Sequence, residues 1–360
     1  MVEPVSNPAA QKPTTGELEP GATGEPSSWI SRVRTSAAFW VGVVLLVLVI
    51  FFGFATPNHA FLNLENLLNI MLDASELLLL AVGMTYLLGA GQLDLSIGSN
   101  VLLSSVVAAR LITSLGGTTD QIAAGNYPHL ALALLLGISA ALATGVLYGL
   151  VNGLLVTKLG ITSFIVTLAT LGIGLGIAYV ITHGTDVPYL PLQLQSGFGI
   201  RKFGGVVPLP VIVTLVFVAI AWFFLALTRY GLRTLAIGSS REAANRAGVP
   251  VDRHLVFLFM QMGFLAAVAG IFDISRFGTT NVAGHQTDNL QAIAAAVIGG
   301  TSLFGGVASI GGTIVGTLIP VTLTNGLILM TIDPFYQLIA IGVILLAAVY
   351  FQERRRRRYM

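Results

Sequence analysis

Four carboxylates stand in or beside long apolar stretches of this chain, where they could relay protons or bind cations. They are Asp73, Glu76, Asp94 and Asp273. An ionisable group inside a bilayer is costly, and it is therefore a functional candidate by default. Each of the four, however, lies near the end of an apolar stretch or beside a glycine-rich break, which favours an interfacial or structural role. Arg276 follows Asp273 at a spacing that suits an ion pair on one helix.

The other chemically reactive residues form no catalytic or metal-binding pattern. The 360 residues include no cysteine, which excludes disulfides, thiolate metal ligands and cysteine nucleophiles. None of the histidines has HExxH or another paired ligand spacing. These five are His59, His129, His183, His254 and His285. The sequence therefore predicts no metal site, no catalytic residue and no enzyme.

The lysines exclude a nucleotide-binding P-loop within the chain. A P-loop needs a lysine directly after a glycine. The lysines are Lys12, Lys158 and Lys202, and none of them follows a glycine. The longest loop between apolar stretches, about 183–208, is also too short for a separate binding domain. If the protein moves a scarce solute, energy and capture come from partners, with no cofactor on this chain.

The composition is that of a membrane protein. Hydrophobic residues make up 55% of the chain and charged residues only 9%, and the mean hydropathy is +0.86. An ordinary soluble domain carries roughly a quarter charged residues. The net charge of +2 does not indicate nucleic-acid binding, because the basic residues cluster at the ends of apolar stretches and in the run ERRRRR at 353–358.

The apolar stretches predict an all-α polytopic fold with about ten transmembrane helices. They cover 37–55, two stretches within 66–112, then 129–153, 162–182, 209–228, 254–273, 288–308, 309–329 and 335–351. A span needs about 20 apolar residues. Re-entrant segments at the glycine-rich breaks 88–96 and 299–306 would lower the count to eight.

Charge and composition divide the chain into three parts. Residues 1–36 are expected to be a disordered cytoplasmic tail, 37–351 the transmembrane domain, and 352–360 a basic cytoplasmic tail. Lys and Arg concentrate in the segments that are cytoplasmic if both termini are inside. The largest of these, 229–253, interrupts two apolar stretches with five arginines.

Within 229–253, the stretch SSREAANRAG predicts a two-turn helix on the membrane surface. Ser239 and Glu242 have capping-box spacing, and Gly248 supplies the stop. Ala243 and Ala244, flanked by Arg241 and Arg246, suit docking into a groove on a soluble partner. The alternative is an interfacial helix that is held only by its own spans.

Five motifs, in this order, resemble the permeases of monosaccharide ABC importers, the ribose, xylose and galactose group. They are GMT (83–85), GQLDLSIGS (91–99), TLATLGIGLGIAYVITHGT (167–185), LAIGSSREAANRAG (235–248) and NLQAIAAAVIGGTSLFGGVASIGGTIVGTLI (289–319). The fourth contains the EAA-x-x-x-G form of ABC permease loops. One departure is Gln92-Leu93-Asp94, where related permeases show Gly-Ile-Asp.

The resemblance implies a cobalamin-importer-like fold in a bacterial cytoplasmic membrane. Two permease copies, a homodimer by expectation, would enclose the pathway. ABC ATPase subunits, often fused into one double ATPase, would carry ATP and Mg²⁺, and an extracytoplasmic sugar-binding protein would deliver the substrate. In this scheme the helix at 239–248 transmits the ATP-driven movement.

A sugar pathway also needs uncharged hydrogen-bonding groups beside broken helices. Glycine pairs and the Gly312-x-x-x-Gly316 spacing favour close backbone crossings. The candidates for the pathway or its gate are Asp94, Ser96, Asn100, Thr167, Thr170, Gly300, Thr301, Ser302 and Gly305. For each of them packing or backbone bonding is the competing role, and for Asp94 it is capping of the following helix.

Two other functions stay open from the residues. A branched-chain amino-acid ABC permease would share this topology, but a zwitterionic substrate would favour a charged pair along the pathway, and the sequence has no strong candidate for one. An ion-coupled secondary transporter would move its solute under an ion gradient without ATP.

Overall fold

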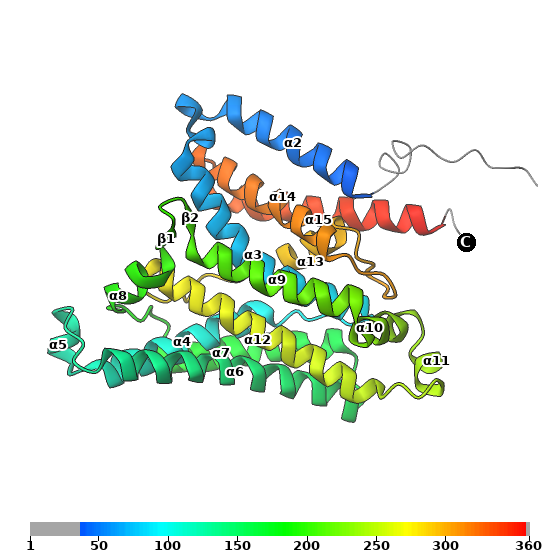
Figure 1. The fold of residues 1–360 in the computed structure, drawn as a ribbon, viewed down its shortest axis with the longest axis horizontal. Coiled ribbons are helices and arrows are strands. Elements are labelled where there is room, and N and C mark those ends of the chain that lie inside the picture. Colours follow the sequence, from blue (N-terminus) through cyan, green and yellow to red (C-terminus); the bar gives the residue numbers. More distant parts are fainter. Residues whose placement is uncertain (1–36, 358–360) are drawn as a thin grey trace, which may run out of the picture. The chain divides into compact units, whose positions relative to one another are not determined.

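The computed structural model describes residues 37–357, which are almost wholly helical (Figure 1). The elements are α2 (Ala37–Ala55), η1 (Pro57–Leu62), α3 (Leu64–Gly89), α4 (Ile97–Gly116), α5 (Thr119–Ala123), α6 (Leu130–Lys158), α7 (Ser163–Thr182), α8 (Leu192–Leu194), η2 (Gln195–Gly199), β1 (Lys202–Phe203), β2 (Val207–Pro208), α9 (Leu209–Leu227), α10 (Arg229–Ser239), α11 (Arg241–Arg246), α12 (Val251–Phe277), α13 (Asp288–Ile298), α14 (Ile310–Leu329) and α15 (Pro334–Arg357). The two short strands form an antiparallel hairpin that pairs Lys202 with Pro208.

The prediction of an all-α polytopic membrane protein is confirmed. Seven helices are long and apolar enough to cross a membrane: α3, α4, α6, α7, α9, α12 and α14. Three shorter apolar helices in the described part of the chain, Val41–Ala55, Asp288–Ile298 and Phe335–Tyr350, complete the ten predicted elements in the predicted order. The tail predicted for 1–36 lies outside the described residues, and α15 stays helical to Arg357.

Three helices form the core of this bundle. In α3, α4 and α12, 72% of the apolar window is buried inside the chain, against 22–33% in α6, α7 and α9. Helix α12 packs against α6, α4 and α3. The outer helices therefore leave most of their apolar residues for lipid or another protein, while polar groups on α3, α4 and α12 must find partners within the chain.

The break between α3 and α4 is a structured turn. Asp94 Oδ1 accepts hydrogen bonds from the backbone N–H and the hydroxyl of Ser96, at 2.8 and 2.6 Å. Asn152, nearly two turns before the end of α6, donates to Ser96 Oγ at 2.9 Å. Helix α4 thus begins at a depth where α6 is still inside its span, so the break reaches into the bundle.

Helix α13 is a half-helix. Its 11 residues span roughly 16 Å, about half of a bilayer core. The predicted close crossing with α14 is confirmed, because a Cβ at Gly312 would lie 1.7 Å from the Gly299 carbonyl oxygen and one at Gly316 would lie 2.1 Å from that of Ala295. The glycine-rich segment 299–309 then leads back to the start of α14.

Candidate functional site

The segment predicted to dock a partner lies at one end of the bundle, opposite α5 and α8 (Figure 1). Helix α11 has six residues, and its N-cap is Ser240, whose hydroxyl accepts the Ala243 N–H at 3.2 Å. The predicted cap at Ser239 is wrong. Helix α10 continues through Ser239, whose hydroxyl donates to the Leu235 carbonyl at 3.0 Å, so the chain leaves helical geometry one residue later.

The surface of α11 combines small side chains with ion pairs. Ala243 is exposed, whereas Ala244 is buried against the bundle. Glu242 pairs with Arg246 rather than closing a capping box, and Arg241 pairs with Asp252 at 2.9 Å. Gly248, at φ 80°, ends the segment in a left-handed turn as predicted. A pocket of about 560 Å³ opens beside these residues. The role of this surface in docking a partner stays a prediction.

Glycines connect α10 to two other parts of the bundle. A Cβ at Gly238 would lie 2.0 Å from the Gly89 carbonyl oxygen, at the end of α3, and 2.6 Å from the Gly306 nitrogen. The Gly306 N–H donates to the same Gly89 carbonyl at 3.0 Å. Gly305 has φ 88°, and a Cβ there would lie 2.5 Å from the Gly238 carbonyl oxygen. Three backbone segments meet here without side chains between them, so a displacement of α10 acts directly on α3 and on the segment before α14.

Side chains attach α10 to α12 as well. The Tyr230 hydroxyl donates to Gln261 Oε1 at 2.9 Å, and Thr234 Oγ1 lies 2.8 Å from His254 Nε2. Burial raises the pKa of Tyr230 well above its ordinary value, so the phenol stays protonated and remains a donor. Helix α10 is therefore hydrogen-bonded to α12.

Six of the predicted pathway residues are buried. One is Thr301, and four of the other five bond into the start of α4 or the turn before it. Asp94 and Ser96 form the turn described above. Asn100 donates to the Gly145 carbonyl of α6 at 3.4 Å. Thr167 donates to the Ser163 carbonyl at 2.8 Å and reaches that of Leu93 at 3.5 Å.

Thr170 joins this group through its backbone. Its carbonyl accepts the Tyr148 hydroxyl at 2.5 Å, and that hydroxyl also lies 2.8 Å from Ser99 Oγ on α4. These contacts run between protein groups and hold α4, α6 and α7 together. Asp94 accepts the Ser96 N–H, but α4 begins at Ile97 without a side-chain cap bond, so Asp94 closes the turn before the helix rather than capping its first turn. A transport role for the set stays a prediction.

The other four predicted pathway residues shape the segment before α14. Gly300 and Gly305 have φ 94° and 88°, in the left-handed region that favours glycine. Thr301 Oγ1 accepts the Ser309 N–H, and Ser302 Oγ accepts that of Phe304, each at 3.2 Å. They define a turn that packs on α10, and their part in gating stays a prediction.

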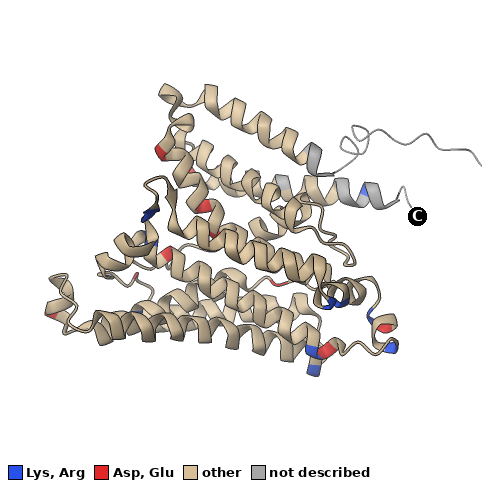
Figure 2. Ribbon diagram, in the orientation of Figure 1, with Lys and Arg blue, Asp and Glu red and all other residues tan. Residues whose placement is uncertain are grey.

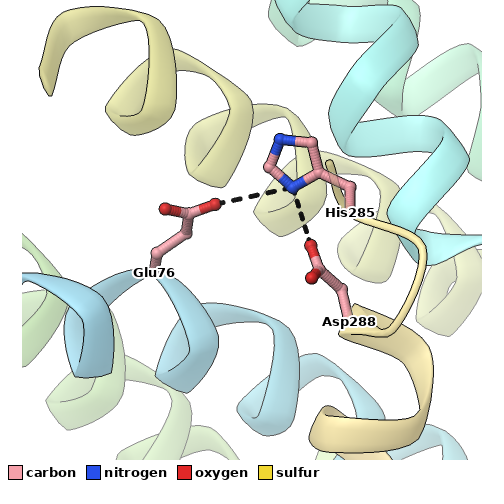
Figure 3. Close-up of side chains that lie close together, drawn as sticks. All are labelled: Glu76, His285 and Asp288. Atoms are coloured by element: carbon pink, nitrogen blue, oxygen red, sulfur yellow. Dashed lines mark hydrogen bonds and ion pairs between the residues drawn. The ribbon is translucent and has the colours of Figure 1, made fainter. Parts of the chain in front are cut away.

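The structure also gathers a charged cluster that no sequence motif indicated. His285 Nδ1 lies 2.8 Å from Asp288 Oδ2 and 3.8 Å from Glu76 Oε1 (Figure 3). Its Nε2 lies 3.6 Å from Asp273 Oδ2. The predicted ion pair between Asp273 and Arg276 is wrong. Arg276 reaches across to Asp73 of α3 at 2.5 Å, while Asp273 faces the histidine.

This cluster borders a pocket of about 350 Å³ between α3, the segment 278–287, α13 and α14. The ligand atoms of Glu76, His285 and Asp288 lie within 4.8 Å of one another, a spacing that could hold a metal ion. The absence of a metal site stays a prediction. Sequence reasoning missed the cluster because its members come from four separate parts of the chain, α3, α12, the segment 278–287 and α13.

Known proteins resemble this chain over most of its length. The family model described as branched-chain amino acid transport system / permease component matches residues 66–349. The ribose import permease of Bacillus subtilis (strain 168) is 35% identical over 320 residues, which cover 88% of this chain and 92% of the relative. The L-arabinose ABC transporter permease of Azospirillum brasilense is 32% identical over 345 residues, covering 94% of this chain and 96% of the relative.

The D-allose transport system permease of Escherichia coli (strain K12) is 32% identical over 317 residues, or 87% of this chain and 92% of the relative. No solved structure matches, and the cobalamin-importer-like arrangement therefore stays a prediction. Since the family model covers more than half of the residues and the relatives align over nearly their whole length, the chain belongs to the permease-component family of these transport systems, and its predicted resemblance to monosaccharide ABC importer permeases is confirmed.

Proposed function

We propose that this chain is the membrane-spanning subunit of an ABC importer that moves a monosaccharide into the cell. The relatives reported above carry the names of ribose, L-arabinose and D-allose transport, although the family description names branched-chain amino acids. The named substrates of these relatives favour a sugar over an amino acid. A transport subunit of this kind is not an enzyme and binds no cofactor itself.

The charge distribution supports an orientation. Lys and Arg positions gather at the end that carries α10 and α11 (Figure 2). This end holds Lys158, Arg229, Arg233, Arg241, Arg246, Arg253 and Arg354 of α15. Lys and Arg are retained on the cytoplasmic side of membrane proteins. We therefore place this end, with both termini, in the cytoplasm of a bacterial cell, under its cytoplasmic membrane.

The partners follow from this function. ABC ATPase subunits, separate or fused, bind ATP and Mg²⁺ and dock on α11. A second copy of the chain covers part of the outward-facing apolar surface and encloses the pathway. An extracytoplasmic binding protein delivers the sugar at the opposite end, near α5 and α8. In the ion-coupled alternative the exposed α11 would need no partner.

One observation carries the proposal: an exposed, capped helix sits directly after a backbone crossing of Gly238 with Gly89 and Gly306. A partner that pulls on α11 moves α10, and α10 cannot move without displacing the end of α3 and the segment before α14. Side-chain rearrangement cannot absorb this motion, because glycine backbones are in direct contact.

The decisive experiment measures ATP-driven uptake by the complete importer in proteoliposomes. Ribose, L-arabinose, D-allose and leucine are offered with the cognate binding protein. We expect uptake of a sugar, dependent on ATP and on the ATPase subunit. Accumulation of a solute by this chain alone under an ion gradient, or uptake of leucine in place of every sugar, would refute the proposal.

The coupling route is tested with Gly238→Ala. The new methyl group must displace the Gly89 carbonyl, so we expect sugar uptake to fall about tenfold or more while the ATPase stays bound. Gly176→Ala, at a helical glycine with open space around it, is the matched control and should import normally. Ala243→Arg changes only the exposed face of α11 and should weaken retention of the ATPase without altering the fold. Wild-type uptake by both test variants would exclude this route.

A further inference from the structure

The pocket beside Glu76 and His285 reaches from the middle of α3 to the last turn of α14, two helices that are long and apolar enough to cross a membrane. Glu76 is in the middle of α3, and the segment 278–287 enters the bundle from the end of α12 to reach it. The His285 carbonyl packs on the start of α4, where a Cβ at Gly98 would come within 2.0 Å of its oxygen. Asn289 of α13 donates to the Leu95 carbonyl at 3.2 Å. Non-helical backbone at this depth is tolerated where protein or a cavity surrounds it.

Two broken helices therefore start beside this pocket. Both α4 and α13 begin inside the bundle, and α13 presents its N-terminal turn, with Asp288, to the cavity. Discontinuous helices mark the substrate sites of many transporters. His285 also has φ 63°, a left-handed conformation that is rare outside glycine and often found where a site imposes it.

The lining offers more hydrogen-bond acceptors than donors. The His285 side chain is only 6% exposed, and Asp288 already occupies its Nδ1. Glu76 Oε1, at 3.8 Å from the same nitrogen, is beyond hydrogen-bond distance and faces the cavity. Its carboxyl oxygens, like those of Asp288, can accept hydrogen bonds, so the pocket complements a ligand rich in hydroxyl donors. Three carboxyl groups surround one imidazole, and this excess of acidic groups disfavours an anion.

The remaining walls are partly apolar. Leu77, Leu80, Val321 and Ile328 line the same cavity, together with the polar residues Asp73, Asn281, Gln291, Thr324 and Asn325. A monosaccharide presents hydroxyl groups on its edge and C–H groups on its faces, which match these two kinds of wall. The volume of about 350 Å³ is at the lower end of the roughly 300–1,000 Å³ typical of small-molecule pockets. A single metal ion would fill only a small part of it.

We propose that this pocket is a subsite in the translocation pathway for an uncharged monosaccharide, with Glu76 and Asp288 accepting its hydroxyl protons. The inference rests on the proposed importer function and narrows its substrate to neutral sugars. Sugar acids and sugar phosphates are rejected by the carboxylates. His285 is a positioning residue that holds Asp288 in place.

The test uses the complete importer with its ATPase and binding protein, and the sugar that the wild type imports. Glu76→Leu removes the acceptor, and we expect uptake to fall roughly tenfold or more, with ATP hydrolysis still stimulated by the loaded binding protein. Glu65→Leu makes the same change at an exposed position of α3 and should import normally. Glu76→Gln combined with Asp288→Asn keeps the shape, and we expect it to admit the corresponding aldonic acid, which the wild type excludes.

The outcomes separate the subsite from the function on which it rests. If the wild type imports no sugar, the proposed function fails. If it imports sugar and Glu76→Leu does so at the wild-type rate, only the subsite is overturned. If a chelator outside the vesicles abolishes uptake and added divalent cation restores it, the pocket holds a cation instead, which also overturns the subsite. Failure of the double variant to admit the aldonic acid overturns the predicted charge selection.

Discussion

Two buried polar groups of this chain differ in how their hydrogen bonds are completed. Around Asp94, most groups meet partners from the same chain: Ser96 gives both its N–H and its hydroxyl to Asp94, and Asn152 of α6 donates to the Ser96 hydroxyl, although Asn152 Oδ1 is left without a partner. Around His285, three carboxylates surround one imidazole beside an open cavity. Both groups lie where helices break, but only the second has unused acceptors next to space for a ligand.

This difference distinguishes polar groups that hold the helices together from polar groups that are available to bind a ligand. A polar group that is fully bonded within the protein fixes helices relative to one another. An ionisable group that faces a cavity without a full set of partners lowers the stability of the fold. Selection for stability alone would replace such a residue. The Asp94 group should therefore matter most for folding, and the Glu76 pocket for transport.

The largest effect on stability is expected for Asp94→Leu. It leaves the Ser96 amide and hydroxyl buried without their acceptor, and we expect a loss of about 3 kcal/mol in the free energy of unfolding. Equilibrium unfolding in mixed micelles, followed by tryptophan fluorescence, measures it. Asp94→Asn keeps an acceptor oxygen and should retain most of the stability and full uptake. Lost uptake in a stable Asp94→Asn protein would instead assign the charge a transport role.

A smaller effect is expected for Tyr148→Phe. The hydroxyl bridges Ser99 of α4 and the Thr170 carbonyl of α7, and a hydrogen bond between membrane helices contributes about 0.6 kcal/mol on average. We expect a loss of about 1 kcal/mol in the same unfolding assay, with normal sugar uptake. A larger loss of uptake than of stability would show that the Asp94 group does more than hold helices.

The smallest effect on stability is expected for Glu76→Leu, which should lose transport. Replacing a poorly paired buried charge by an apolar residue of similar size is often neutral or stabilising. We expect the free energy of unfolding to stay within about 1 kcal/mol of wild type. Destabilisation as large as that of Asp94→Leu would remove the distinction between the two groups.

Much of the fold could be predicted from residue order alone. Ten apolar stretches predict ten helices because a bilayer requires each span to satisfy its own backbone. The spacing of Gly312 and Gly316 also predicts that another helix crosses α14 closely there, because glycines let two backbones approach each other. The short helix after α10 was predicted, but its cap was shifted by one residue, because Ser239 and Ser240 have equal capping chemistry and only the extent of α10 selects Ser240.

The charged pocket could not be predicted in this way. Glu76 and Asp273 were recognised as candidates and His285 was not, and nothing in their spacing relates α3 to the segment after α12. Arg276, the nearest positive charge in sequence, was the wrong partner for Asp273. It pairs with Asp73 on another helix, and a contact between helices cannot be read from sequence spacing.

The sequence by itself determined that this chain spans a membrane many times, that no P-loop lies within it, and that one basic segment interrupts its apolar stretches. These properties follow from composition and local sequence pattern, because the hydropathy and charge of each segment determine whether it inserts into a bilayer. Only the tertiary structure decided which polar groups pair with one another and which face a cavity. Hydrogen bonds and ion pairs act over a few ångströms, and helix packing alone brings residues 200 positions apart to that distance.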